Sequence, residues 1–257
     1  MTAISTAVGS ERLSRTTGYK IGKLFPSNET ENLPQKIVII GQANTANEAL
    51  ISLDAQEIIS AEEAGKLFGY GSPIHSVIRI LRPSGSSGVG GIPTIVIPQK
   101  VAEGATASTK TFTVTGTAKQ NITQVVKIAG RESLDFQSYS FSISKDDTAT
   151  QIATKIANSV NKVLGSPFTA SATTDTVVFT SKFKGEVSKD IEIEFSSDAI
   201  ETGITYAQTE KTDGSGLADF SNLKDYFGQE WYTIVLNTYG QNAMSLLQDI
   251  NGINYLN

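Results

Sequence analysis

The sequence of 257 residues contains no cysteine and a single histidine, His75. Without cysteine, disulfides, thiol catalysis and cysteine-ligated zinc are all excluded. With one histidine, multi-histidine metal sites are excluded as well, and a Ser-His triad would have to use His75. Positive charge is not in excess either, since the formal net charge is −5. This balance argues against nucleic-acid binding as the main task, because a binding face needs clustered Lys and Arg.

Long hydrophobic runs are also missing. Runs such as IVII (37–40) and IVI (95–97) are far too short to span a bilayer, and residues 1–20 lack the apolar core of a signal peptide. We therefore expect a soluble chain that is made inside the cell and does not insert into a membrane. The content of 39% hydrophobic and 18% charged residues is typical of a globular chain with one large domain or two smaller ones.

Two short apolar runs have the pattern of buried strands. KIVIIG (36–41) and PTIVIP (93–98) are continuous, as expected of strands that are covered on both faces. The segment between them has the pattern of two helices. This order predicts α/β architecture for residues 25–98.

Both of these helices have recognisable start signals. Ser60 can cap the first helix, and Glu63, three residues later, completes a capping box. Ser72 can cap the second helix, and Pro73 fits its first helical position. One apolar stripe predicts the buried face of the second helix: Ile74, Val77, Ile78 and Leu81.

Residues 99–210 have a different composition, rich in Thr and alternating between apolar and polar residues. A period of two predicts strands with one buried face, here at 111–116, 124–130, 138–144, 176–182 and 190–195. One helix interrupts them, and Asp147 or Thr148 can cap it. Its apolar positions recur every four residues: Ile152, Ile156 and Val160. We expect a mainly antiparallel α+β domain in this block.

The α/β pattern returns after the Thr-rich block. Residues 216–228 predict a helix, EWYTIVLNTY (230–239) a further buried strand, and 241–250 the start of another helix. Because this pattern flanks the block on both sides, we expect one domain to be inserted into the other. The predicted parts are an extended N-terminal arm (1–24), an α/β domain (25–98 and 211–257) and the inserted α+β domain (99–210).

The glycine-rich segment SGSSGVGG (84–91) is the first candidate for a phosphate site. A P-loop needs a strand, GxxxxGK[ST] and a helix in that order, so that helix amides and a lysine meet the phosphates. Here a helix precedes the glycines, a strand follows, and GK[ST] is absent, which favours a flexible connection. The exit from the first strand, IVIIGQANTAN (37–47), is better placed. It has one glycine and no clear helix after it, so an ordinary loop is favoured over a nucleotide site.

Three alternating carboxylates are a candidate metal site. Asp190, Glu192 and Glu194 share one face of a strand and could hold a hard cation. The favoured alternative is a solvated face, with Ile191, Ile193 and Phe195 pointing inward.

The remaining polar and aromatic candidates have simpler explanations. Asp146 and Asp147 are favoured as helix caps over catalytic acids, and His75 has no carboxylate or nucleophile at a motif spacing, which favours a surface or packing role. Trp231 and Tyr232 are expected in a core or an interface. The sequence therefore predicts no catalytic site, no metal site and no cofactor.

Several longer segments form an ordered set. They are TGYKIGK, LPQKIVIIGQA, EEAGKLFGYGSPIHSVIRILR, TFTVTGTA, KIAGRES, DDTATQIATKIANSVN, FTASATTDTVVFTSKFKGEVSKDIEIEF and EWYTIVLNTY. In this order they resemble the contractile tail sheath proteins of Mu-like phages. The resemblance spans about residues 17–250, and EWYTIVLNTY is similar to the strand on which the main domain of that family resumes.

The resemblance implies a structural role without enzymatic activity. The expected fold is an incomplete α/β sheath domain with an inserted α+β domain on the outer surface. Such subunits polymerise as stacked hexameric rings around a tail tube, and their contraction drives the tube through the host envelope for genome ejection. The implied partners are other sheath subunits, the tail tube protein, and baseplate and tail terminator proteins, with no nucleic acid. The implied location is the tail of the virion, after assembly in the host cytoplasm.

The resemblance also implies a role for the first 24 residues. Terminal arms in this family add strands to the sheets of neighbouring subunits, and an extended segment gains its backbone hydrogen bonds on such an edge. The inter-subunit contacts implied for the arm are Ile4, Val8, Leu13, Tyr19, Ile21 and Leu24.

Members of the family continue beyond the point where this sequence ends, with the rest of the sheath domain and a C-terminal arm. The expectation is therefore either a fragment or a chain whose remaining half another chain supplies. Two other functions stay open. One is a surface-binding baseplate or adhesin component whose Thr-rich domain binds a glycan, and the other is an α/β enzyme that uses a nucleotide.

Overall fold

The computed structural model describes residues 35–84, 88–129, 137–196, 199–226, 232–240 and residue 243. Residues 36–257 form one compact unit. Its buried apolar side chains nevertheless fall into separate clusters. We call residues 36–98 together with 218–243 the α/β part, and residues 105–212 the Thr-rich part.

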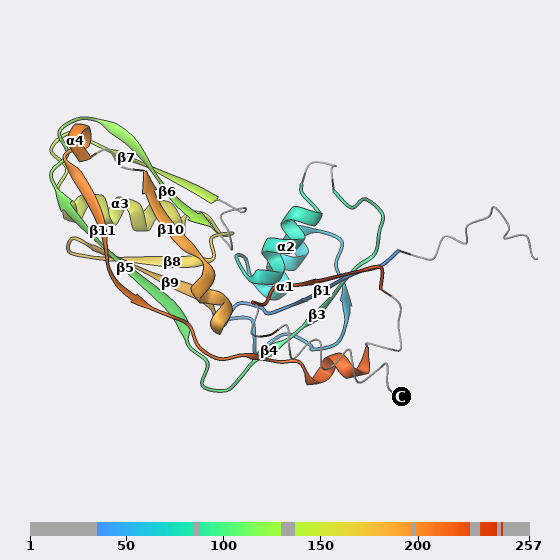
Figure 1. The fold of residues 1–257 in the computed structure, drawn as a ribbon. Coiled ribbons are helices and arrows are strands. Elements are labelled where there is room, and N and C mark those ends of the chain that lie inside the picture. The colour runs from blue at the N-terminus through green and yellow to red at the C-terminus, as the bar shows by residue number, and fades with distance from the viewer. Residues whose placement is uncertain are drawn as a thin grey trace, which may run out of the picture. The chain divides into compact units, whose positions relative to one another are not determined.

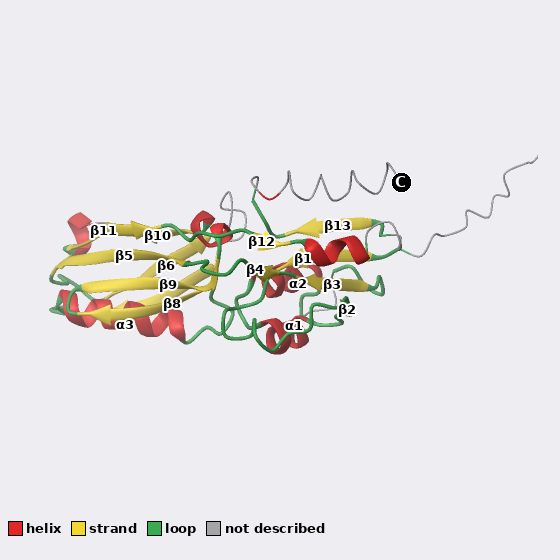
Figure 2. Cartoon of the chain, turned by 90° about the horizontal axis from the view of Figure 1, so that it is seen from below, coloured by secondary structure: helices red, strands yellow, loops and turns green. Residues whose placement is uncertain are grey.

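The α/β part is built on a four-stranded sheet with the strand order β13, β1, β3, β2 (Figure 2). β1 (Ile37–Gly41) lies between β13 (Ile234–Asn237) and β3 (Thr94–Pro98) and runs parallel to both. β2 (Gln56–Glu57) pairs antiparallel with β3. All five residues of β1 are buried, which explains the continuous apolar run, because both faces of this strand are covered.

Two helices cover one face of this sheet (Figure 1). α1 (Ala61–Phe68) begins at Ser60, whose hydroxyl accepts a hydrogen bond from the backbone N–H of Glu63 at 3.2 Å. α2 (Pro73–Leu81) begins at Ser72, which caps its helix in the same way. The sequence predicted both helix starts correctly. The helices and the sheet share one apolar cluster, which includes Ile39, Ala64, Phe68, Ile74, Ile78 and Val96.

The other face of the sheet packs on the segment that follows the Thr-rich part. The helix predicted over 216–228 is wrong for the described residues, where Ala218–Asp219 is the short strand β12 and Ser221–Asp225 is a single 3-10 turn, η4. β12 pairs antiparallel with β4 (Lys100–Val101), so its backbone is bonded to another strand and is not free to form helical bonds. The buried side chains on this face include Val38, Ile40, Ile97, Phe220, Leu223 and Tyr239.

The Thr-rich part contains two antiparallel sheets. The four-stranded sheet has the order β11 (Ile204–Thr212), β5 (Ala107–Gly116), β9 (Thr176–Lys184) and β8 (Phe168–Thr173). The three-stranded sheet has the order β10 (Glu192–Ser196), β6 (Ile122–Ala129) and β7 (Gln137–Ile143). Each strand predicted in this block overlaps one of β5, β6, β7, β9 and β10, whereas β8 and β11 were not among the predicted strands.

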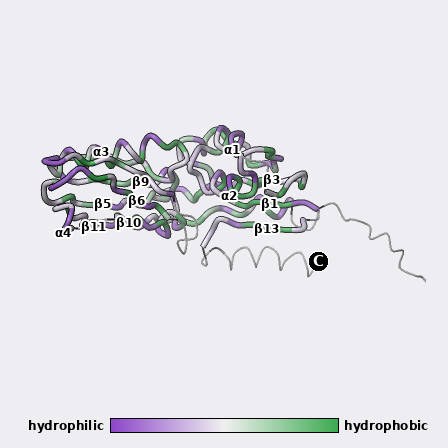
Figure 3. Tube along the Cα trace, turned by 90° about the horizontal axis from the view of Figure 1, so that it is seen from above, coloured by the Kyte–Doolittle hydropathy of each residue, from purple (hydrophilic) through white to green (hydrophobic). Residues whose placement is uncertain are grey.

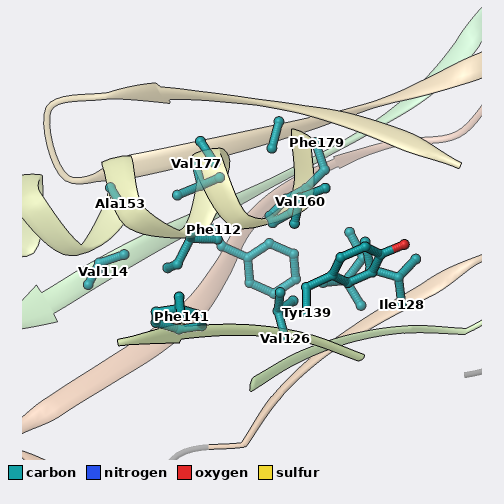
Figure 4. Close-up of a cluster of buried hydrophobic side chains, with 14 of the residues drawn as sticks. Phe112, Val114, Val126, Ile128, Tyr139, Phe141, Ala153, Val160, Val177 and Phe179 are labelled. Atoms are coloured by element: carbon teal, nitrogen blue, oxygen red, sulfur yellow. The ribbon is translucent and has the colours of Figure 1, made fainter. Parts of the chain in front are cut away.

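The helix α3 (Ala149–Asn161) completes the Thr-rich part and begins with a capping box. Of the two predicted caps, Thr148 is the N-cap, and its backbone N–H donates to the side chain of Gln151 at 2.9 Å. Figure 4 shows Phe112 between α3 and the three-stranded sheet, among side chains that include Val160, Val126 and Tyr139. The Thr-rich part therefore buries an apolar core of its own.

A short α-helix, α4 (Ala199–Thr202), precedes β11, and a 3-10 helix, η3 (Glu186–Asp190), lies between β9 and β10. Val187 of η3 packs against the core of the Thr-rich part and against the cluster under η4 in the α/β part. η3 thus lies where the two parts meet.

Candidate functional site

The loop that follows β1 joins the two parts of the chain. We call residues Gln42–Glu48 the β1 loop. The side-chain amide of Gln42 donates to the backbone carbonyl of Lys184 at 2.6 Å, and the backbone N–H of Thr45 donates to the carbonyl of Lys182 at 2.9 Å. Both acceptors lie on β9, so the loop at the end of β1, which was the better-placed candidate for a nucleotide site, is hydrogen-bonded to the Thr-rich part.

The β1 loop is also fixed to the end of α1. Asn44 is buried; its backbone N–H donates to the carbonyl of Phe68 and its side-chain amide donates to the carbonyl of Tyr70, both at 2.8 Å. Asn47 donates to the carbonyl of Leu67 at 3.1 Å. The last carbonyls of a helix have no partner within the helix, and here the β1 loop supplies partners.

His75 is buried in α2, with 5% of its surface exposed. Its Nδ1 accepts a hydrogen bond from the backbone N–H of Gly71 at 3.2 Å, and its ring meets the ring of Tyr70 edge-on at 5.3 Å. Burial, followed by the nearby charges of Arg79 and Lys182, lowers the pKa of His75 to about 4. The ring is therefore neutral near pH 7 and has the packing role that was one of the two predicted.

The row of carboxylates on and before β10 is divided by burial. Glu192 and Glu194 are exposed, whereas Ile191 and Ile193 are buried. For Glu192 and Glu194 this arrangement is the solvated face that the alternation favoured, whereas Asp190 lies in η3 and not on the strand, so the prediction that it shares the strand face is wrong. Within the described ranges, no group of three or more Asp, Glu or His side chains is placed to hold a metal ion.

The second half of the glycine-rich segment is tied to the end of α2. The Arg82 guanidinium donates to the carbonyls of Gly90 at 3.2 Å and Ile92 at 2.6 Å. The backbone N–H of Val89 donates to the carbonyl of Leu81 at 3.0 Å. A guanidinium has five donors in a rigid fork, so one side chain fixes several carbonyls. Residues 88–92 are thus hydrogen-bonded to the end of α2, and residues 85–87 of the segment lie outside the described part of the chain.

β13 lies at the edge of its sheet and pairs with β1 alone in the described part of the chain. Figure 3 shows hydrophobic colour along β13 as along β1, yet Ile234 and Val235 are each 47% exposed. The prediction that 230–239 contains a strand is confirmed, but the prediction that the strand is buried is wrong. Burial here depends on a neighbour that β13 lacks on one side among the described residues.

An apolar cleft of about 220 Å³ lies between α2 and the Thr-rich part. Pro73 and Val77 line one side, and Ile128, Pro167 and Phe183 are among the residues on the other. Side chains from the two parts therefore do not pack closely along the whole of their boundary.

Several predicted residues lie outside the described part of the chain. They are the six arm residues Ile4, Val8, Leu13, Tyr19, Ile21 and Leu24, and also Trp231. The helix predicted at 241–250 is outside it too, except for residue 243. Tyr232 is described; it is partly buried and packs against the cluster under η4, so of the two expected positions, a core or an interface, the structure shows contact with a core.

No helix in the described ranges is both long enough and apolar enough to cross a membrane.

Comparison with known proteins finds a similarity to a phage tail sheath protein. The chain is similar to the Mu-like prophage FluMu tail sheath protein of Haemophilus influenzae, with 24% identity over 207 residues. The match covers 79% of this chain and 40% of that relative, so the chain spans less than half of the relative's length. No protein-family model matches the sequence. The predicted resemblance to the Mu-like tail sheath group is confirmed by this match.

Proposed function

We propose that this chain is a structural subunit of a contractile phage tail sheath. The similarity to a tail sheath protein carries this proposal. It extends over 207 residues, which is longer than either the α/β part or the Thr-rich part, so both parts share in it. In this role the subunits polymerise as stacked hexameric rings around a tail tube. A change in the packing between subunits shortens the array and drives the tube through the host envelope without a nucleotide.

In this proposal the α/β part belongs to the sheath domain and the Thr-rich part is a domain inserted into it. The partners are further sheath subunits, the tube protein, and the baseplate and tail terminator proteins. The subunit is assembled in the host cytoplasm and is found in the virion tail, and its work requires neither a cofactor nor enzymatic activity.

The position of β13 at the edge of its sheet among the described residues supports an assembly role. Edge strands are the usual place where a further strand is added to a sheet, and on β13 the half-exposed Ile234 and Val235 offer apolar surface. In the proposal, residues 1–24 form an arm that adds a strand to the sheet of a neighbouring subunit. Its contact residues would be Ile4, Val8, Leu13, Tyr19, Ile21 and Leu24.

The separate core of the Thr-rich part supports a position on the outer surface. Phe112, Phe168 and Phe179 are buried inside it, and alternate residues of β10 face solvent. Because these aromatic rings point inward, they do not form the exposed stacking platform that would favour glycan binding by an adhesin.

The proposal can be tested with a short epitope in the β8–β9 turn at Thr174–Asp175, where the backbone reverses and Thr174 has a φ of 54°. Phage particles that carry the tagged subunit are labelled with gold-coupled antibody and imaged by electron microscopy. A sheath subunit gives gold along the whole length of the tail. Gold only at one end of the tail would support the baseplate or adhesin alternative, and unlabelled particles would contradict both.

A further inference from the structure

Two passages of the chain connect the α/β part with the Thr-rich part, and they lie side by side. β4 and β12 pair at one end of this connection. Next to them, the N–H of Ala102 donates to the carbonyl of Leu217 at 2.9 Å, and the N–H of Thr106 donates to the carbonyl of Ser215 at 3.0 Å. We call this pair of passages the ribbon. A ribbon of two strands is weak support by itself, so it can bend unless something else holds the two parts.

The apolar cleft between α2 and the Thr-rich part makes such support more important. Its volume of about 220 Å³ is space in which the two parts have no direct van der Waals contact. The orientation of the parts therefore depends on the contacts at other places along their boundary.

The β1 loop supplies three of these contacts, all of them hydrogen bonds. Gln42 and Thr45 bind two alternate carbonyls of β9, at Lys184 and Lys182. The carboxylate of Glu48 accepts a hydrogen bond from the backbone N–H of Val101 in the ribbon at 3.0 Å. One short loop thus binds the Thr-rich part and the ribbon, while Asn44 fixes the same loop to the end of α1.

The burial of these groups gives the contacts their strength. Gln42 is 2% exposed and Asn44 is 7% exposed. A hydrogen bond that is shielded from water is stronger than an exposed one. A buried acceptor that loses its donor also costs free energy, because it no longer has a hydrogen-bond partner. Bending at the ribbon would break the hydrogen bond from the Gln42 amide to the Lys184 carbonyl. Each group would then have to reach water or stay buried without a partner.

We propose that the β1 loop fixes the orientation of the Thr-rich part relative to the α/β part, so that the two parts move as one rigid body. This role of the loop is a property of the single chain, and it does not depend on the function proposed above. A force applied to one part is then passed to the other through the β1 loop as well as through the ribbon.

The experiment measures the distance between two spin labels in the full chain by pulsed electron paramagnetic resonance. The labels are attached at Ile80→Cys on α2 and Asn158→Cys on α3, both at exposed positions. Labelling is specific because the natural sequence has no cysteine. The expected result for the labelled chain is a single narrow distance distribution. After Gln42→Glu, a carboxylate faces the carbonyl of Lys184 and the hydrogen bond is lost. The two parts should then change their relative orientation more freely, and the width of the distribution should increase at least twofold.

Gln56→Glu is the matched control. Gln56 donates to the carbonyl of Ser52 at 3.1 Å, so its loss removes the same kind of bond within the α/β part alone and should leave the distribution narrow. Hydrogen exchange gives a second measurement, since the N–H of Thr45 should exchange at least tenfold faster in Gln42→Glu and at an unchanged rate in Gln56→Glu.

Two outcomes would contradict the proposal that the β1 loop fixes the orientation of the two parts. One is a broad distribution in the labelled chain before any change at Gln42, and the other is an equally narrow one after Gln42→Glu. If Gln42→Glu does not fold, Gln42→Met removes the donor without adding a charge, and the same two measurements decide the question.

Discussion

The backbone of Gly71 lies directly against the carbonyl oxygen of Ser166. A Cβ atom on Gly71 would stand 2.1 Å from that oxygen, and the φ of Gly71 is +83°. Gly71 is in the turn between α1 and α2, and Ser166 lies just before β8, so this contact joins the α/β part to the Thr-rich part. Glycine is needed here for two reasons, because any side chain would strain the backbone and would also collide with the other part.

Gly71→Ala should therefore lower the free energy of unfolding by about 3 kcal/mol or more, which combines left-handed strain with a displaced backbone. Gly90→Ala is the control, since Gly90 also has a positive φ of +61°, but a Cβ atom on it would meet no other atom within 4 Å. We expect a loss of about 1–2 kcal/mol there. Urea unfolding followed by circular dichroism measures both, and equal losses would show that the contact with Ser166 does not matter.

His75 should make the stability of the fold depend on pH. Its pKa is about 4 in the folded chain against an ordinary value of 6.5, because burial and then Arg79 and Lys182 disfavour the charged ring. Between these values the unfolded chain binds a proton that the folded chain does not. The free energy of unfolding should therefore fall as the pH is lowered from about 7 to about 4, by about 3 kcal/mol in total.

The matched variant for this prediction is His75→Asn. The Asn oxygen can accept the hydrogen bond from Gly71 in place of Nδ1, but it does not titrate. Hydrogen bonds from Lys155 and Ser221 lower the pKa values of Asp147 and Asp219 from their ordinary value of 3.8. The contribution of these two carboxylates to the free energy of unfolding is therefore lost mainly below pH 4, outside the range in which His75 acts. Unfolding curves between pH 4 and pH 7 that are parallel for the variant and the natural chain would contradict a role for His75.

Val235→Lys tests whether the edge of β13 is used in assembly. Val235 is 47% exposed, so a lysine can reach water and the folded chain should lose no more than about 0.5 kcal/mol. Lysine on an edge strand opposes pairing with another strand, so tail assembly should be reduced. Particle counts by electron microscopy measure the effect. Val163→Lys is the control, because Val163 is similarly exposed at 42% but lies after α3, and an equal loss with both variants would argue against β13.

Removal of residues 1–24 tests the proposed arm. Residues 36–257 form a compact unit of their own, so the shortened chain should fold with an unchanged midpoint of thermal unfolding. Sheath assembly should be weakened, because the strand that the arm adds to a neighbouring subunit is lost. Complementation of a phage that lacks the natural gene measures assembly. Normal numbers of intact tails with the shortened chain would rule out this role for the arm.

The sequence by itself determined the features that depend on near neighbours in the chain. Ser60, Ser72 and Thr148 cap their helices because each accepts from an N–H three residues later. The strands of the Thr-rich part follow from a period of two. The fully buried β1 follows from a continuous apolar run. The ordered set of such segments also carried the resemblance to tail sheath proteins.

Only the tertiary structure decided the features that depend on distant partners. Gln42 and Lys184 are 142 residues apart, so no local pattern shows that the β1 loop joins two parts. The runs of β1 and β13 are similarly apolar, but β1 has a strand on each side, whereas β13 is at the edge of the sheet in the part of the chain that the structure describes. Pairing with β4 replaced the helix predicted around β12. In each case burial and hydrogen bonding were set by a segment that folding brings near, and periodicity carries no information about that segment.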